Sequence, residues 1–242
     1  MEIVTLGFIS VFTSLVAGVV GLGGGLMLIA ILPSFLPLQA VIPVHGITQM
    51  FSNISRAYFG YKNIQFEVVP KFLIGSILGV GIVAFILDMI SLQYIPLFIG
   101  SYILLSLWSQ KFNEKIKKYE NYYLIGILQS GLSVAVGTTG PLATTLLLKE
   151  YQDKDKVVST AALLMSITHI LKVFVFIYFG FKFFQYFDII LIMVTGAVVG
   201  SYLGTKIRDK VDGTKLIFIL KILLSLLSVK LIVGYFEVNF YL

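Results

Sequence analysis

Hydrophobic residues in this chain fall into long runs that are separated by short polar connections. Most of the runs have the length of about 20 residues that a helix needs to cross a bilayer once. The runs cover residues 3–33, 41–59, 70–87, 92–108, 122–148, 157–180, 186–204 and 216–236. The pattern therefore predicts an all-α membrane protein embedded in a lipid bilayer.

Two of these runs, 3–33 and 122–148, are too long for one straight membrane-crossing helix and too short for two. Each is interrupted by a glycine-rich break, Gly21 to Gly25 in the first and Gly137 to Pro141 in the second. Backbone at bilayer depth leaves the helix only where protein or water satisfies its polar groups. A matched pair of breaks thus indicates the lining of a cavity. The alternative is that the glycines only permit close helix packing.

The two halves of the chain resemble each other in sequence. Three pairs of segments align in the same order at offsets from 116 to 121 residues: 14–24 with 130–140, 59–62 with 179–182, and 75–88 with 196–209. Three ordered matches favour a duplication over chance similarity between apolar segments. We therefore divide the chain into a first membrane repeat, 1–110, a basic cytoplasmic linker, 111–121, and a second membrane repeat, 122–242.

Lysine and arginine residues in the connections bear on the orientation of the repeats. If both broken runs re-enter on the side from which they came, thirteen of fourteen such residues lie on one side and only Lys182 lies on the other. Basic connections favour the cytoplasmic side, so this arrangement is preferred. It leaves three full spans per half, hence inverted repeats with both termini outside. The alternative, eight full spans with parallel halves, divides the same residues seven against seven.

Composition excludes several classes of protein. Hydrophobic residues make up 58% of the 242 residues and charged residues 12%, so a water-soluble domain is excluded. The net charge of +6 is spread over connections rather than gathered on one face, which argues against a nucleic-acid partner. The absence of cysteine removes disulfides and thiol chemistry. We expect a multi-pass protein of the plasma or inner membrane.

The helices that restart after the breaks, near Leu26 and Leu142, are candidates for anion binding. Their first N–H groups are unpaired within the helix, and the helix dipole makes this end positive. Such an end is a natural site for an anion, and threonine hydroxyls add further donors. The predicted contacts from the two breaks are Gly23, Gly24, Gly25, Gly137, Thr138, Thr139 and Gly140.

Polar residues inside the apolar runs supply the remaining candidates. Ionisable groups at membrane depth are costly and usually face the protein interior or a water-filled path. We expect Arg56 and Lys172 to attract the anion, whereas Arg56 could instead snorkel from the end of its span. The two histidines are expected to bind substrate or carry protons, or else to be packed core residues. The candidates are His45, Gln49, Asn53, Arg56, His169 and Lys172.

No aspartate or glutamate lies deep in any run. A cation pathway built on buried acids is therefore disfavoured. Paired-carboxylate catalysis and most metal sites are removed as well, and no serine follows a nucleophile-elbow pattern. We expect neither enzymatic activity nor a cofactor or metal ion.

The two glycine-rich breaks and the polar runs resemble those of the TauE/SafE, or sulfite exporter, family of membrane permeases. The resemblance covers nearly the whole chain, from the break at Gly18 to Gly25 with its following Pro33, through the polar second run, to the break at Gly137 to Pro141. It implies a secondary transporter, working by alternating access, of a small sulfur-containing anion such as sulfite, thiosulfate, sulfoacetate or another organosulfonate.

Two rival functions fit the same residues, a passive anion channel and a non-transporting membrane scaffold subunit. The tips of the breaks differ, with Leu22 and Gly23 in the first half against Thr138 and Thr139 in the second. The two halves are therefore expected to bind a ligand asymmetrically. The sequence leaves open whether the chain forms a homo-oligomer.

Overall fold

A computed structural model gives the fold and describes residues 2–21, 23–87, 92–117, 121–139, 141–211 and 213–240. Within these ranges the chain is built from helices and turns, without a strand. The α-helices are α1 (Glu2–Val20), α2 (Gly24–Ile31), α3 (Leu38–Phe59), α4 (Val69–Leu87), α5 (Ile95–Trp108), α6 (Gln110–Lys117), α7 (Tyr122–Val136), α8 (Pro141–Glu150), α9 (Lys154–Tyr178), α10 (Phe187–Ile207) and α11 (Gly213–Phe240). Short 3₁₀ helices occupy the connections: η1 (Leu32–Ser34), η2 (Tyr61–Asn63), η3 (Phe66–Val68), η4 (Leu92–Tyr94), η5 (Phe183–Tyr186) and η6 (Arg208–Lys210).

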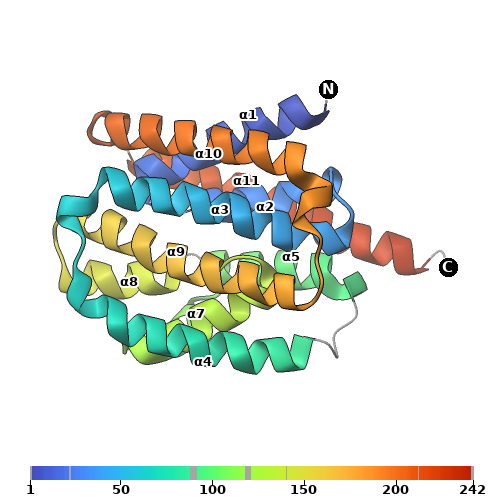
Figure 1. The fold of residues 1–242 in the computed structure, drawn as a ribbon, viewed down its shortest axis with the longest axis horizontal. Helices are drawn as coiled ribbons and strands as arrows, with labels where there is room; N and C mark the ends of the chain where they lie inside the picture. The colour runs from blue at the N-terminus through green and yellow to red at the C-terminus, as the bar shows by residue number, and fades with distance from the viewer. Residues whose placement is uncertain are drawn as a thin grey trace.

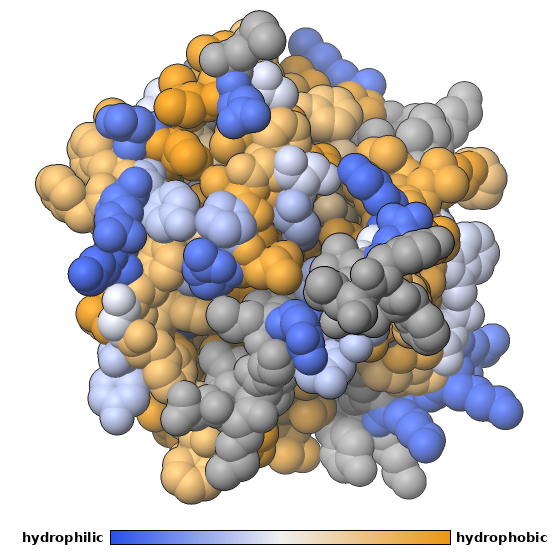
Figure 2. Space-filling view, turned by 90° about the vertical axis from the view of Figure 1, so that its right-hand side faces the viewer, coloured by the Kyte–Doolittle hydropathy of each residue, from blue (hydrophilic) through white to orange (hydrophobic). Residues whose placement is uncertain are grey.

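The outer surface of the bundle is apolar. Among the described residues, four helical segments are long and apolar enough to cross a membrane: Glu2–Val20, Phe66–Ile86, Lys154–Tyr178 and Phe183–Ile207. Figure 2 views one end of the bundle, where hydrophilic residues are interspersed among hydrophobic ones. Large apolar side chains such as Phe8 and Phe85 are mostly exposed. Water would not support such a surface, whereas lipid does. The chain is an all-α membrane protein, as the hydrophobic runs predict.

At both glycine-rich breaks the preceding helix ends at a glycine with positive φ. Gly21 follows α1 with φ of 85°, and Gly137 follows α7 with φ of 83°. These two glycines correspond at the 116-residue offset. Non-glycine residues rarely adopt this conformation, so the glycines fix where α1 and α7 stop.

The first break turns the chain back. In Figure 1, α1 runs leftward from the N-terminus, and α3 starts again at the right-hand side. Helices α1 and α2 thus form a hairpin. Helix α9 starts instead at the left-hand side, so the chain leaves the second broken segment, α7 and α8, at the opposite end of the bundle.

Helices α3 and α9 lie against each other in the middle of the bundle, between the pairs α1–α10 and α4–α7. Glycines bring each outer pair close together. A Cβ on Gly200 of α10 would collide with the backbone of α1, and one on Gly79 of α4 would collide with the backbone of α7. Such small-residue contacts are typical of packing between membrane helices.

One helix was absent from the sequence prediction. Helix α6 lies within the stretch treated as a basic linker, of which residues 118–120 are outside the described part of the chain. Phe112 of α6 packs edge-on against Tyr102 of α5, with ring centroids 6.2 Å apart. The high density of lysines concealed this short amphipathic turn.

Candidate anion site

The two breaks meet beside the middle of α3. A methyl group added to Gly25, at the start of α2, would lie 3.2 Å from Thr138 Oγ1 of the second break. The same group would lie 3.4 Å from Gln49 Oε1, near the centre of α3. The first break, the second break and the polar face of α3 therefore converge on one place.

A small pocket occupies this place, and we call it the first-break pocket. It is lined by Ala17, Gly21, Gly23, Gly24, Gly25, Leu26, Gln49, Asn53, Arg56, Thr138 and Met165. The centres of water-sized groups can occupy ≈ 30 Å³ of it, which is room for about two waters. Seven of its lining residues are among those predicted from the sequence.

The start of α2 supplies backbone donors to this pocket. Gly23 precedes the helix with φ of 91°, and no side chain of the described residues caps the helix start. The first N–H groups of α2 are therefore available, at the positive end of the helix dipole.

In the second break, described polar groups are hydrogen-bonded to Gln129 of the preceding helix α7. The Ala143 N–H donates to Gln129 Oε1 at 2.9 Å, and the Thr139 hydroxyl donates to the Gln129 carbonyl at 2.6 Å. Gln129 thus caps the start of α8. Among the described residues, a side chain caps the start of α8, whereas none bonds to the first N–H groups of α2 at the pocket.

Arg56 brings a positive charge to the pocket wall. Its side chain is only 4% exposed, so the snorkelling alternative for this residue is wrong. One terminal nitrogen donates to the Ala17 carbonyl at 2.8 Å and the other donates to Asn53 Oδ1 at 2.5 Å.

Two hydrogen-bond donors on the pocket wall have no acceptor among the described residues. Arg56 Nε and Gln49 Nε2 are buried and find no hydrogen-bond partner among the described residues. Nearly all buried polar groups in proteins are hydrogen-bonded. These two atoms indicate that an acceptor, such as an anion oxygen or a water, belongs in the pocket.

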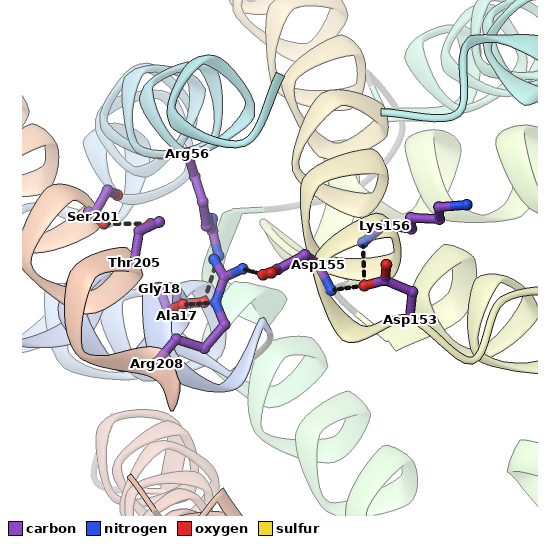
Figure 3. A network of polar contacts seen from close by, with 9 residues as sticks. All are labelled: Ala17, Gly18, Arg56, Asp153, Asp155, Lys156, Ser201, Thr205 and Arg208. Carbon is purple, nitrogen blue, oxygen red and sulfur yellow. Dashed lines mark hydrogen bonds and ion pairs between the residues drawn. The ribbon is translucent and has the colours of Figure 1, made fainter. Parts of the chain in front are cut away.

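A second arginine lies beside Arg56, as Figure 3 shows. Arg208 Nε donates to the Gly18 carbonyl at 2.9 Å, and its guanidinium forms an ion pair with Asp155 at the start of α9. Ala17 and Gly18 are consecutive carbonyls at the end of α1, where cations compensate the negative end of the helix dipole. In the sequence pattern Arg208 lies in the basic connection that follows the run 186–204.

Three of the remaining predicted residues form a second group next to the pocket, which we call the His–Lys cluster: His45, His169 and Lys172. The Nζ of Lys172 is fully buried and donates to the Gly137 carbonyl and, at 3.2 Å, to Ser133 Oγ. His45 Nε2 donates to the Gly25 carbonyl at 3.0 Å, and the two imidazole rings are 5.7 Å apart.

The structure thus divides one predicted site into two neighbouring groups. His45, Gly137, Thr139, His169 and Lys172 are not among the residues that line the first-break pocket. Gly140 lies outside the described residues. Within the described part of the chain, no group of three or more His, Asp or Glu residues is placed to hold a metal ion.

Comparison with known proteins gives one match. A model of the family described as Sulfite exporter TauE/SafE matches residues 6–231. The match covers both breaks and all the residues of the two groups. Neither the curated proteins nor the solved structures give a match.

Proposed function

The chain belongs to the sulfite exporter TauE/SafE family, and from this premise we propose that it is a secondary transporter of a small sulfur-containing anion that works by alternating access. The family consists of membrane transporters rather than enzymes. The observation that carries the proposal is the set of unused donors around the first-break pocket: the start of α2, Arg56 Nε and Gln49 Nε2.

The chemistry of the pocket supports an anion as its ligand. Sulfite and thiosulfate present several acceptor oxygens and a negative charge. The pocket offers backbone N–H groups, amide and hydroxyl donors and one guanidinium, and no carboxylate lies among its lining residues. Charge-assisted hydrogen bonds of this kind are stronger than neutral ones.

The size of the pocket supports a compact anion. Room for about two waters suits an inorganic oxyanion better than the longer sulfoacetate or another organosulfonate. We assign anion contact to Gly23, Gly24, Gly25, Gln49, Asn53, Arg56 and Thr138. His45, Gly137, Thr139 and Lys172 then support the pocket through their hydrogen bonds, and His169 lies beside His45.

We further propose that residues 1–110 and 122–242 are repeats joined by the basic linker 111–121. Matched packing supports this proposal. The pairs α1–α10 and α7–α4 are related by exchange of the two halves. A hydrogen-bonded hydroxyl triad joins each set of corresponding helices, one from α1, α3 and α10 and the other from α7, α9 and α4: Ser14, Ser52 and Ser201, and Ser130, Thr168 and Ser76.

Inverted repeats with re-entrant breaks follow from the same proposal. The connections α3–α4, α8–α9 and α10–α11 all lie at the left of Figure 1, while the α9–α10 connection lies at the right. We assign the left side to the cytoplasm because basic residues concentrate in its connections.

Single cysteines test this orientation, because the chain has no cysteine of its own. In intact cells, a membrane-impermeant maleimide is expected to label Lys182→Cys and to leave Lys62→Cys unlabelled until the cells are opened. The eight-span alternative puts both positions on one side. Equal labelling of the two variants would therefore exclude inverted repeats.

Flux into proteoliposomes tests the transport function. We expect saturable uptake of radiolabelled sulfite or thiosulfate, and faster uptake when unlabelled anion is present inside. A passive channel would show no such counterflow, and a scaffold subunit would show no flux. Either of these results would overturn the proposed function.

A further inference from the structure

The two histidines of the chain are buried against each other at its centre. His45 lies on α3 and His169 on α9, both with 0% exposure, and their rings meet edge to face at 69°. His45 Nδ1 and both ring nitrogens of His169 have no hydrogen-bond partner within the described residues. Buried imidazole nitrogens without partners leave capacity for a proton or a water.

This histidine pair is connected to both breaks. His45 donates a hydrogen bond to the carbonyl of Gly25, a residue that lines the first-break pocket. Lys172, one helical turn after His169, donates a hydrogen bond to the Gly137 carbonyl at the second break. The pair therefore bonds directly to the first break and is separated from the second by Lys172.

The basic side chains nearest the two rings are Lys172 of α9, one turn from His169, and Arg56, on the same face of α3 as His45. Helix α2 has no titratable side chain. In the other elements packed on α3 and α9, the titratable side chains lie at or near the helix ends or in short turns. They are Glu2, Tyr61, Lys62, Lys71, Tyr94, Tyr122, Tyr123, Lys149, Glu150, Tyr186, Asp188, Tyr202 and Lys206. No carboxylate of these helices thus stands beside the rings to balance a proton.

An anion in the pocket changes this balance. A proton on either ring adds a positive charge near the basic side chains of Lys172 and Arg56, and repulsion between like charges opposes it. A bound anion cancels part of that repulsion. Anion and proton therefore favour each other's binding, and the effect is reciprocal.

We propose that the His45–His169 pair binds a proton that travels with the anion, so that the protein is an anion–proton symporter. The inference rests on the proposed transport function. The proton is taken from water on one side onto an imidazole nitrogen lone pair, and it is released to water on the other side. On the first side an O–H bond of a hydronium ion breaks as the N–H bond forms, and on the other side the N–H bond breaks as an O–H bond to water forms.

Thiosulfate flux in proteoliposomes tests the inference, because thiosulfate, unlike sulfite, does not itself carry a proton near neutral pH. With the membrane potential clamped at zero and the outside one pH unit more acidic, one proton per anion drives up to about tenfold accumulation. A pH-sensitive dye inside is expected to report acidification as thiosulfate enters. Both effects are expected to disappear in His169→Gln while thiosulfate counterflow persists. In the double variant with His45→Gln, which also changes the bond to the Gly25 carbonyl, proton coupling is likewise expected to be lost.

Ser228→Ala serves as the matched control, because Ser228 is a buried residue of α11 that bonds only within its own helix among the described residues. It is expected to keep full coupling. Counterflow by the wild-type protein without acidification or accumulation would overturn the inference and leave the transport function standing. Absence of counterflow would overturn both. Coupling that survives in the double variant would exclude the histidines as the proton site.

Discussion

Replacement of Arg56 by glutamine is expected to lower anion uptake at limiting concentration by about 10- to 150-fold. A hydrogen bond to a charged group contributes about 1.5–3 kcal/mol, and each 1.4 kcal/mol is about a factor of ten in affinity. Glutamine removes the guanidinium charge and the unpaired Nε donor. Arg56→Lys keeps the charge without the planar donor set, so an intermediate loss is expected. Uptake measured against anion concentration gives the apparent affinity.

Arg208→Gln is the matched control for this variant. Arg56 and Arg208 bond to consecutive carbonyls at the end of α1, but only Arg56 lines the pocket. Both variants are expected to lower the thermal unfolding temperature in detergent, whereas apparent affinity should fall only for Arg56→Gln. Equal losses of affinity in the two variants would mean that Arg56 acts by supporting α1 rather than by touching the anion.

Gly25→Ala is expected to reduce transport by about 10- to 200-fold without lowering stability. One added methyl group in a well-fitted site changes recognition by about 1–3 kcal/mol. The new Cβ would stand 3.2 Å from Thr138 Oγ1 and 3.4 Å from Gln49 Oε1, inside the pocket. Alanine also favours a helix over glycine by about 1 kcal/mol. Loss of flux together with an unchanged or raised unfolding temperature would therefore identify an effect on the pocket.

Gly81→Ala makes the same exchange in α4, where an added Cβ meets no described atom within 4 Å, and it should leave flux unchanged. Gly24 is a poorer position for this test. A Cβ there would collide with the Thr13 carbonyl and lie 2.7 Å from the Cβ of Ala17, so a loss of flux would report the packing of α2 on α1. Flux at the wild-type level in Gly25→Ala would show that the anion passes elsewhere.

The helices could be predicted from the sequence because bilayer length and hydrophobicity fix them directly. Each apolar run corresponds to one or two helices within a few residues at each end, and the two broken runs divide where glycine permits a left-handed residue. Helix α6 was not predicted, because only two of its residues, Phe112 and Ile116, are apolar in a lysine-rich stretch.

The sequence could predict which residue types form the candidate site. It could not predict that they separate into the first-break pocket and the His–Lys cluster. Helical spacing puts His45, Gln49, Asn53 and Arg56 on one face of α3, yet it does not tell which of them faces the anion and which faces α9. The capping of α8 by Gln129, and the pairing of Arg208 with a carbonyl 190 positions away, depend on tertiary contacts. No local pattern signals them.

The most direct test of the first-break pocket is to locate a bound anion. Selenite is a heavier analogue of sulfite, and its selenium can be found by anomalous X-ray scattering in crystals of the protein. The account predicts one ordered selenium in the first-break pocket, with its oxygens within hydrogen-bonding distance of Arg56 and of the first N–H groups of α2. An ordered selenium elsewhere, with this pocket empty at a concentration that saturates transport, would contradict it.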